Sequence, residues 1–513
     1  MVVFNSTSSN DMAIMTEDGL VVYNLGNIAW VLVAAGLVFL MIPGVGFFYS
    51  GLLRCKNALT VLILTMMVSA VASFEWFFWG FSLAFSETGG PFIGNLDHFG
   101  LINVDIGVST GGENIPQLVY CLFQMMFAAL TPAIACGAFA DRARIGPVLL
   151  FFFCWCTIVY NPLAYWTWNS NGWGYNLGGI DFAGGTPVHI SSGTAALVIS
   201  VFLGRRHGYG TEALAYRPHN VPHVILGTTM LWFGWFGFNG GSGIGANLRA
   251  AQAFMVTHIA ACVGGLTWML WDYRLEKKWS AVGFCSGVIS GLVAITPASG
   301  YVGTPSALVF GVVGATACNF ATSLKNLLGY DDALDIFAAH AIGGITGNIL
   351  TALFADGRVA SFDGSDPSDG SGWINHHYVQ LGYQLADSVS GFGWSFVLTL
   401  ILLFLIDNIP YCHFRVDEKD ELIGTDIAQV GEEAYAIPHY AHREAHQPVD
   451  LEMGERPWEM RHAPDTEAVT EKAQVSMQAP ESPATALPEK RLDVPRTSTK
   501  GERVRSRDAV DRS

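Results

Sequence analysis

Two histidines, His189 and His340, stand inside long apolar stretches of the sequence, 151 residues apart, and each begins the pattern His-x-x-x-Gly. A carboxylate, Asp181, lies eight residues before His189, where the same apolar stretch begins. Ionisable side chains are expensive to place in a hydrocarbon layer, so those found there usually serve a function. The two stretches therefore suggest a pore that is lined by a pair of imidazoles.

The chemistry open to such a pair is proton sharing. Two facing imidazoles can hold one proton between them or pass it along, which suits a lining for small hydrogen-bonding solutes or a proton relay. The alternative for a single histidine is a core imidazole bonded to a neighbouring helix, and we interpret His258 in this way because it has no counterpart elsewhere. A zinc site is not expected, because His189 and His340 are only two ligands and no third is suitably spaced.

Aromatic residues gather near the ends of three apolar stretches. Phe123 and Phe127 are four residues apart and would share one face of a helix. Trp168 ends a second stretch, and Phe238 lies four residues before Ser242 at the end of a third. An aromatic belt at the membrane surface is the ordinary explanation. A tryptophan face beside a hydroxyl can also attract a small cation, with roughly 0.5–2 kcal/mol.

The elements that must position these residues are membrane helices. Of the 513 residues 51% are hydrophobic, and the mean hydropathy is +0.36. A helix of about 20 residues crosses a hydrocarbon layer of roughly 30 Å. Eleven stretches meet this requirement, at about 28–50, 58–84, 117–138, 146–168, 185–204, 221–240, 252–272, 280–297, 304–322, 333–354 and 386–410.

The charged residues predict the orientation. Eleven of the thirteen Lys and Arg residues before residue 412 fall in alternate connections, and only Arg249 and Arg358 fall on the other side. Cytoplasmic loops carry the excess of cations in membrane proteins, so we expect the N-terminus outside and the C-terminus inside. Asn5, in the sequon Asn-Ser-Thr, would then be available for glycosylation. The net charge of −16 argues against nucleic acid as a partner.

An odd number of spans in each half predicts an inverted repeat. If residues 28–204 and 221–354 each cross five times, the halves have opposite orientations and are related by a two-fold axis in the membrane plane. His189 in the fifth span and His340 in the tenth would then be symmetry mates. A helix at 386–410 stands outside the repeat. The predicted fold is an all-α polytopic membrane protein with a 5+5 inverted repeat and an eleventh helix.

Composition divides the chain into four segments. Residues 1–27 are predicted to form an extracellular segment, and residues 28–411 form the membrane domain. Residues 412–439 mix apolar and charged side chains and would dock on the cytoplasmic face. Residues 440–513 are rich in Pro, Glu, Arg, Ser and Thr, a composition that cannot bury enough surface to fold, so we predict a disordered tail.

Four motifs resemble the Amt/Mep/Rh ammonium transporter family. They are Asp-Phe-Ala-Gly-Gly-Thr-Pro-Val-His at 181–189, Gly-Trp-Phe-Gly-Phe-Asn-Gly-Gly-Ser at 234–242, Asp-Asp-Ala-Leu-Asp-Ile-Phe-Ala-Ala-His at 331–340, and the tail motif at 424–435. They occur in family order, and the resemblance covers about residues 25–437. The chain is most similar to the fungal Mep permeases that retain both histidines.

The resemblance implies roles for the aromatic residues. Trp168 and Ser242 would form an outer ammonium site, with Phe123 completing an aromatic cage. Phe127 and Phe238 match the stacked gate of the family.

Deeper in the protein, the resemblance implies that His189 and His340 form the twin-histidine pore. Asp181 matches an acid near the recruitment site, with a structural and electrostatic role. The family also implies a homotrimer with one pore in each subunit. We expect no cofactor and no metal.

The function that we expect is nitrogen uptake across a plasma membrane. The chain would be a permease for ammonium and methylammonium and not an enzyme. The permease would deprotonate ammonium and conduct ammonia plus a proton in a net electrogenic process. The alternatives are an ammonium sensor that signals from the membrane and an electroneutral gas channel of the Rh kind. The resemblance implies a phosphorylated threonine in plant relatives where this chain has Ala428, so a regulatory kinase would act instead on distal tail sites such as Ser476 or the run Arg496-Thr497-Ser498-Thr499.

Overall fold

The structure is a computed structural model, and it describes residues 11–16, 19–211 and 218–435. The candidate glycosylation site Asn5 and the predicted tail, with Ser476, Thr497 and Thr499, lie outside these residues. The described chain is mostly helical, and eleven of its helical segments are long and apolar enough to cross a membrane. This number confirms the eleven predicted spans.

The first five spans are built from helices that are often interrupted and then continued. They are α1 (Leu25–Leu52); η1 (Cys55–Asn57), α2 (Ala58–Glu75), η2 (Trp76–Gly80) and α3 (Phe81–Phe85); α4 (Gln117–Ala135) and η4 (Cys136–Ala138); α5 (Ile145–Trp155), η5 (Cys156–Tyr160), α6 (Asn161–Trp168) and α7 (Trp173–Leu177); and η6 (Gly185–Ile190) and α8 (Ser191–Leu203).

The second group of spans also combines long and interrupted helices, but its second span is one continuous helix, α10 (Leu248–Glu276). Its members are α9 (Val221–Gly241); α10; α11 (Ala281–Ile295) and η8 (Thr296–Ala298); α12 (Thr304–Ala321) and α13 (Leu324–Leu328); and η9 (Phe337–Ile342) and α14 (Gly343–Phe354), and the eleventh span, α16 (Gln380–Asp407), comes after them.

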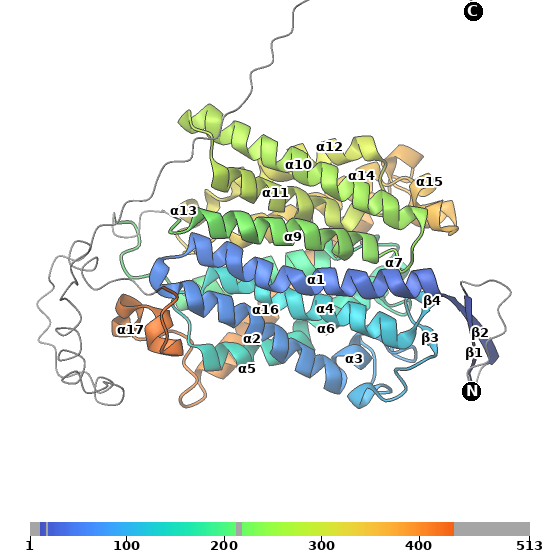
Figure 1. The fold of residues 1–513 in the computed structure, drawn as a ribbon, viewed down its shortest axis with the longest axis horizontal. Coiled ribbons are helices and arrows are strands. Elements are labelled where there is room, and N and C mark those ends of the chain that lie inside the picture. The colour runs from blue at the N-terminus through green and yellow to red at the C-terminus, as the bar shows by residue number, and fades with distance from the viewer. Residues whose placement is uncertain (1–10, 17–18, 212–217, 436–513) are drawn as a thin grey trace, which may run out of the picture. The chain divides into compact units, whose positions relative to one another are not determined.

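Short elements occupy the two ends of the bundle (Figure 1). One end, the hairpin end, carries β1 (Asp11–Thr16), β2 (Gly19–Asn24), β3 (Val108–Ser109), β4 (Gly112–Pro116), η3 (Phe99–Leu101), α7, α15 (Gly357–Ala360), η10 (Ser361–Asp363), η11 (Pro367–Gly370) and η12 (Trp373–Asn375). The other, the α17 end, carries η1, η4, α13, α17 (Glu418–Ile423) and η13 (Asp426–Val430).

Two antiparallel hairpins, β1 with β2 and β3 with β4, were not predicted. In the first, Asp11 pairs with Asn24 and Ala13 with Val22. Their strands are at most six residues long and lie outside the apolar stretches on which the prediction rested. The chain is therefore mostly helical rather than all-helical.

Close helix contacts hold the bundle together. α1 packs along α9, and α10 packs against α11 and α12. Gly227 of α9 faces α1 so closely that a Cβ there would lie 2.3 Å from the backbone nitrogen of Phe48. Lipid is as apolar as the helix surfaces, so close packing of small residues supplies much of the attraction between membrane helices.

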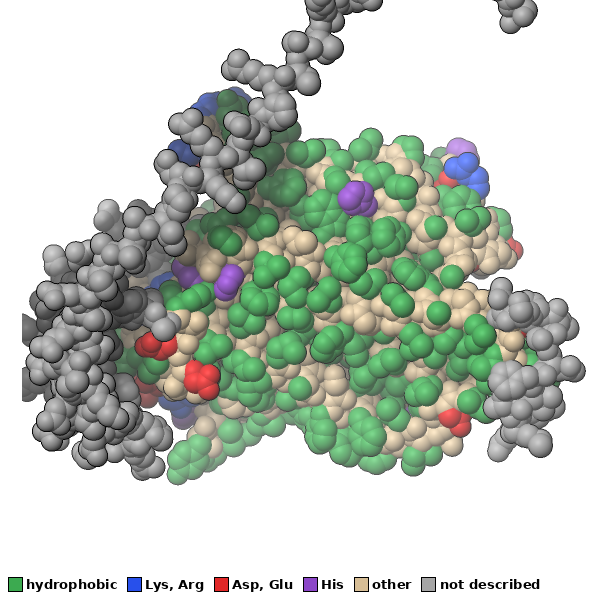
Figure 2. All heavy atoms as spheres, in the orientation of Figure 1, with side chains coloured by type: hydrophobic (Ala, Val, Ile, Leu, Met, Phe, Trp, Pro, Cys, Tyr) green, Lys and Arg blue, Asp and Glu red, His purple; other side chains and the backbone are tan. Residues whose placement is uncertain are grey.

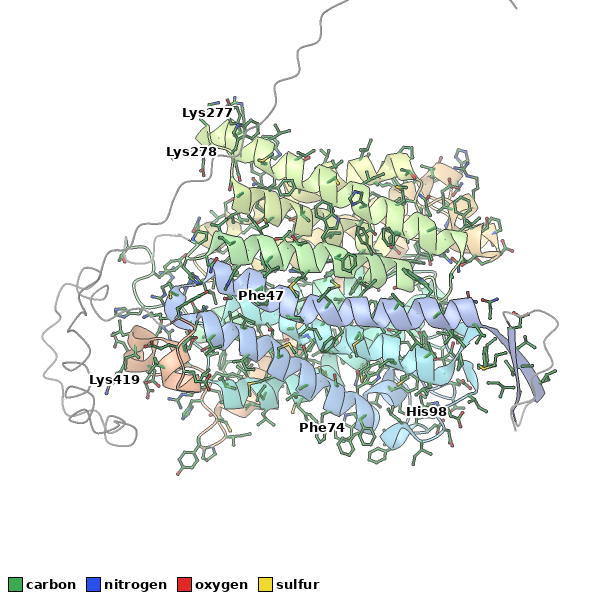
Figure 3. All side chains as sticks on the ribbon, viewed as in Figure 1. Phe47, Phe74, His98, Lys277, Lys278 and Lys419 are labelled. Carbon is green, nitrogen blue, oxygen red and sulfur yellow. The ribbon has the colours of Figure 1, made fainter. Side chains whose placement is uncertain are left out.

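Apolar side chains cover the sides of the bundle. Figure 2 shows hydrophobic side chains along the length of the helices, with the visible charged groups mostly toward the ends. In Figure 3, Phe74 points away from the side of the bundle, whereas Lys277, Lys278 and Lys419 lie at the α17 end. Phe74 is 59% exposed. A surface of this kind suits a bilayer, in which apolar groups face lipid and charged groups remain near water.

Both histidines that the sequence singled out, His189 and His340, lie in wide helical turns. His189 belongs to η6 and His340 to η9, and both segments have π-helical hydrogen bonding before they continue as α8 and α14. π-helical turns inside α-helices are rare and frequently occur at functional sites. The predicted spans 185–204 and 333–354 contain both segments, but their π-helical form was not predicted, because the apolar pattern does not distinguish it from ordinary helix.

Candidate functional site

His189 and His340 meet deep inside the bundle. Their Nδ1 atoms are 3.2 Å apart and their ring centroids 5.3 Å apart. At this distance one Nδ1 carries a proton that the other accepts. His189 is fully buried, and its Nε2 has no hydrogen-bond partner among the residues that the structure describes. The pair can thus share one proton while a further ring nitrogen stays available.

The His-x-x-x-Gly patterns explain how the two rings come so close. A Cβ on Gly193, four residues after His189, would lie 2.4 Å from the backbone nitrogen of Ala341, next to the other histidine. A Cβ on Gly344, four residues after His340, would lie 2.8 Å from the carbonyl oxygen of Gly185. Each glycine therefore makes room for the segment that carries the opposite histidine.

Stacked and edge-on rings connect the histidines to the hairpin end. The rings of Phe127 and Phe238 stack with centroids 4.3 Å apart. Trp168 meets Phe127 edge-on at 5.9 Å, and Phe238 lies over His189 at the same centroid distance, 5.9 Å. Trp235 stacks on His189 at 5.4 Å. The rings form an unbroken series from Trp168 to the imidazole pair.

A cavity of about 250 Å³ opens on the Trp168 side of this series. Trp168, Ser242, Phe127 and Asp181 line it, as does Gln124, whose Oε1 has no partner in the described part of the chain. Ser242 Oγ donates to the carbonyl oxygen of Phe238, 2.8 Å away. Its lone pairs therefore remain able to accept a hydrogen bond. The cavity combines aromatic rings with oxygen acceptors, which suits a small cation that donates hydrogen bonds.

Phe123 stands apart from the other predicted cage residues. Its ring is fully buried and meets Phe127 edge-on at 5.0 Å. It also packs so closely on Gly241 that a Cβ there would lie 2.7 Å from the ring. The cavity is lined by Trp168, Ser242 and Phe127 but not by Phe123, so Phe123 supports Phe127 from behind.

Asp181 fixes the loop that leads into η6. Its carboxylate accepts hydrogen bonds of 2.8 Å from the backbone N–H groups of Gly184, Gly185 and Thr186. These groups begin a helix, where a negative charge is favourable. Trp168 Nε1 donates to the Asp181 carbonyl oxygen at 3.1 Å, so the same residue orients the tryptophan. Asp181 thus holds both the loop and the indole of Trp168 through these hydrogen bonds.

A second acid lies behind Asp181, and the sequence analysis missed it. Thr186 Oγ1 donates to Asp387 of α16, and Asn348 Nδ2 donates to Thr186 Oγ1 at 2.9 Å and to Ser388 Oγ at 2.9 Å. Asp387 is a carboxylate inside an apolar stretch. Asp387 is therefore recognisable in the sequence by the same rule as the two histidines, as an ionisable residue within an apolar stretch.

A smaller cavity, of about 60 Å³, lies on the far side of the histidines. His340 and Trp235 line it, together with Tyr49 and Asp335, near the α17 end. Tyr49 donates to the carbonyl oxygen of Ile134 at 2.7 Å. The stacked Phe127–Phe238 pair and His189 therefore separate two cavities.

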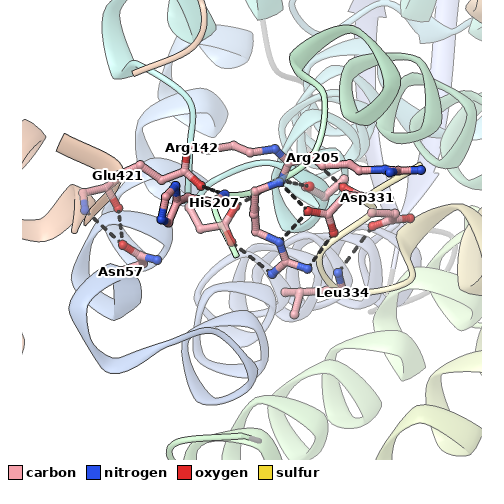
Figure 4. Close-up of polar contacts among 12 residues, drawn as sticks. Asn57, Arg142, Arg205, His207, Asp331, Leu334 and Glu421 are labelled. Atoms are coloured by element: carbon pink, nitrogen blue, oxygen red, sulfur yellow. Dashed lines mark hydrogen bonds and ion pairs between the residues drawn. The ribbon is translucent and has the colours of Figure 1, made fainter. Parts of the chain in front are cut away.

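Ion pairs join the connections between helices at the α17 end (Figure 4). Arg206 contacts Asp331 at 2.7 Å and Asp141 at 3.1 Å, and Arg142 contacts Asp141 at 3.1 Å. Burial alone would raise the pKa of Asp141, but Arg206 and Arg142 outweigh it and hold that pKa below its usual range. These four residues form the ion network of this end.

The predicted docking segment, 412–439, supplies α17 and η13 at this end. Glu421 accepts from the backbone N–H of His207 at 2.6 Å and from Arg415 at 2.9 Å. Asp426 accepts from the backbone N–H groups of Leu59 and Thr60 at 3.0 and 2.7 Å, at the start of α2. A carboxylate stabilises a helix N-terminus in this position.

The match to known proteins covers the whole described membrane body. Residues 29–435 match the model of the Ammonium Transporter Family. The chain belongs to this family. It is 55% identical over 413 residues to Ammonium transporter 1 of Schizosaccharomyces pombe, covering 80% of this chain and 83% of the relative. It is 47% identical over 428 residues to Ammonium transporter MEP2 of Saccharomyces cerevisiae, with 82% and 85% covered.

Solved structures agree with the family match. The crystal structure of Candida albicans Mep2 superposes with a TM-score of 0.74 at 47% identity, covering 80% of this chain and 90% of that structure. The chain is accordingly a multi-pass membrane transporter of ammonium and not an enzyme. The resemblance drawn from the four motifs is confirmed, together with the similarity to fungal Mep proteins.

Proposed function

We propose that ammonium enters the 250 Å³ cavity, loses a proton before the stacked rings, and crosses as ammonia, while its proton follows by way of His189 and His340. The transport would be net electrogenic. The observation that carries this proposal is the order of groups along one line. A cavity with cation-attracting groups comes first, then a dry aromatic barrier, then two imidazoles with a shared proton, and then a second cavity.

Recruitment would depend on Trp168 and Ser242. The indole face attracts a cation, and the Ser242 hydroxyl and Gln124 Oε1, which has no partner among the described residues, accept its hydrogen bonds. These groups replace only part of the hydration shell of ammonium. The remaining loss of water disfavours the charged form and lowers the pKa of ammonium itself. Deprotonation at the end of the cavity is then favoured.

Selection would take place at the barrier. The rings of Phe127 and Phe238 are in contact, with centroids 4.3 Å apart, so they must part for a solute to pass. Ammonia is neutral and can cross an apolar region. Potassium is similar in size to ammonium but has no proton to release, so it keeps its charge and is excluded.

The histidine pair would carry the proton. One N–H bond of ammonium breaks, and its proton passes to His189 Nε2 when the two phenylalanine rings part. The proton already shared between the two Nδ1 atoms then moves to His340, and His340 Nε2 releases its own proton toward the α17 end. His189 Nε2, without a protein partner within the described chain, can accept a hydrogen bond from a solute or donate one to it. Ammonia and the proton recombine in the water beyond the second cavity.

The orientation also belongs to this proposal. Arg54, Lys56, Arg142 and Arg206 all lie on connections at the α17 end. Cations mark the cytoplasmic side, so we propose that the hairpin end faces outward and the α17 end inward, in a plasma membrane. The family resemblance supports a homotrimer with one pore per subunit.

Control by a kinase is a separate prediction. Its sites, Ser476, Thr497 and Thr499, lie outside the described residues. A chain that ends at residue 439 should transport ammonium but no longer respond to the nitrogen supply. Uptake that stays fully regulated without residues 440–513 would contradict tail control.

One experiment separates the proposed function from its alternatives. Cells that lack other ammonium transporters would express the chain, and both labelled methylammonium uptake and ammonium-evoked current would be measured at several pH values. We expect saturable uptake together with inward current, and neither in cells without the protein. A sensor alone would give no uptake. An electroneutral gas channel would give uptake without current, and either result would overturn the proposal.

A further inference from the structure

A buried cation lies on the boundary of the recruitment cavity. Arg249, in the first turn of α10, lines the same cavity as Trp168 and Ser242. Its side chain is 13% exposed. The guanidinium lies 4.5 Å from the ring centroid of Tyr301 and 5.0 Å from that of Phe182, and Nε donates to the Gly300 carbonyl oxygen at 2.9 Å. These contacts fix the charge in place.

A fixed positive charge is unexpected beside a site that attracts cations. Unpaired, Arg249 would repel every cation that enters, and it would repel a divalent ion twice as strongly as a monovalent one. The structure supplies a counter-charge, because Arg249 Nη1 contacts Asp363 Oδ2 at 2.8 Å. The two residues are 114 positions apart in the sequence, at the start of α10 and in η10.

Asp363 is held in its charged form. Burial would raise the pKa of its carboxyl, but hydrogen bonds from Ser365 and Arg249 outweigh this and keep the pKa below its usual range. Its side chain is 19% exposed. The carboxylate therefore cancels the charge of Arg249 across the ordinary range of external pH, and the two residues together contribute no net charge.

We propose that the Arg249–Asp363 ion pair determines which cations enter, because Asp363 cancels the positive charge that Arg249 places on the lining of the recruitment cavity. The other charged residue of that lining is Asp181, whose carboxylate accepts three backbone hydrogen bonds and is the same in every variant. Loss of Asp363 adds one positive charge to the cavity, which opposes ammonium. Loss of Arg249 adds one negative charge, which attracts ammonium but also attracts calcium, and calcium has no proton to give up and blocks entry. This inference rests on the proposed recruitment site.

If the ion pair acts through its charges, loss of Asp363 and loss of Arg249 should shift the KM for methylammonium uptake in opposite directions. Asp363→Asn should raise the KM for methylammonium uptake about 3- to 10-fold, whereas Arg249→Gln should lower it and make uptake sensitive to millimolar calcium. The double variant Arg249→Gln/Asp363→Asn should return KM and calcium sensitivity close to wild type. Arg249→Lys keeps the charge and should stay close to wild type in both measurements.

A control is available on the same end of the protein. Arg358 pairs with Asp356 at 3.3 Å, and its side chain is 78% exposed. Arg358→Gln removes the same charge away from the cavity and should leave KM and calcium sensitivity unchanged. Each value is measured after the amount of protein at the cell surface has been matched.

The results distinguish an electrostatic role of the Arg249–Asp363 pair from a purely structural one. If Arg249→Gln and Asp363→Asn both raise KM, or if the double variant is worse than either, the pair only braces the loops and the inference is overturned. If Arg249→Gln does not reach the membrane, Asp363→Asn and Arg249→Lys decide the matter. Trp168→Leu is measured in the same series, because an unchanged KM in that variant would refute the recruitment site itself rather than the role of the ion pair.

Discussion

The ion network at the α17 end and the line of groups from Trp168 to His340 both bury polar atoms, but they do so in different ways. In the network, Arg206 contacts Asp141 and Asp331, and Arg142 contacts Asp141. Along the line, His189 Nε2 and Gln124 Oε1 have no partner among the residues that the structure describes.

This difference is informative because an unpartnered buried polar group costs about 1–3 kcal/mol. The network avoids that cost, as expected for groups that stabilise the fold. The groups between Trp168 and His340 carry this cost at positions where a passing solute can supply the missing hydrogen bond. We infer that the paired charges stabilise the frame of this transporter. Other buried atoms of the described chain, such as Arg54 Nε and Glu75 Oε2, also have no partner, so it is the position of Gln124 Oε1 beside the larger cavity and of His189 Nε2 between the two cavities that assigns them to the path.

The largest effect should come from breaking the network. Arg206→Met leaves Asp141 and Asp331 buried without their main partner, which costs about 3–5 kcal/mol when one side of a buried pair is removed. The variant should give little folded protein and a markedly lower melting temperature in detergent. Arg144→Met is the control, because Arg144 pairs with an exposed Asp417 and such pairs contribute about 0–1 kcal/mol.

The pH dependence of folding stability tests whether the ion pairs of Arg206 cause the loss of stability in Arg206→Met. The pKa values of Asp141 and Asp331 are held low, so their stabilisation is present above the ordinary carboxyl range and is lost as the pH falls through the lowered values. The gap in stability between wild type and Arg206→Met should therefore narrow in acid. A gap that stays constant would show that the ion pairs contribute little.

The next largest effect should come from separating the two histidines. Gly193→Ala places a Cβ 2.4 Å from the backbone nitrogen of Ala341, so η9 must move away from α8. Overpacking of this kind costs about 1–3 kcal/mol, and we expect uptake to fall roughly 10-fold or more while protein still reaches the surface. Gly36→Ala in α1 meets nothing within 4 Å and should transport normally. Equal uptake by both variants would contradict the need for close approach.

A smaller effect should follow from loss of the indole face. Trp168→Leu removes an attraction worth roughly 0.5–2 kcal/mol, so the KM for methylammonium should rise roughly 2- to 30-fold, with the maximal rate little changed. Trp279 lies on a connection at the α17 end and is 60% exposed, so Trp279→Leu serves as the matched control. A fall in maximal rate at constant KM would place Trp168 in conduction instead of recruitment.

The smallest effect should come from the hydroxyl in the same cavity. Ser242→Ala removes one acceptor, and a single hydrogen bond contributes about 0.5–1.5 kcal/mol net, so KM should rise roughly 2- to 10-fold. Ser323→Ala, at the other end of the bundle, should leave KM unchanged. If Ser242→Ala also keeps the wild-type KM, the cation is held by the rings and Gln124 without this hydroxyl.

The sequence predicted the helical fold and the meeting of His189 with His340 for one physical reason. Apolar stretches of sufficient length are easy to count, and ionisable residues inside them are rare. Asp387 satisfies the same rule and could have been found. The π-helical turns at both histidines could not, because backbone hydrogen bonding of this kind leaves the apolar pattern unchanged.

Contacts between distant segments were also beyond the sequence. Arg249 was counted only as a cation in an outer connection, because nothing near it in the chain identifies Asp363 as its partner. Trp235 lies within a recognised motif, but its stacking on His189 depends on how α9 packs against η6. The short hairpins lacked the length and apolar content on which the prediction of spans depends.

The most direct test of the proposed path is ammonium-evoked current in a chain that carries His189→Leu and His340→Leu together. The change removes both imidazoles and leaves the ion network at the α17 end intact, so folded protein should still reach the surface. We predict that the current falls to the level of cells without the protein, at every pH measured. A current equal to that of the wild type would falsify the account, because the proton would then cross without the histidine pair.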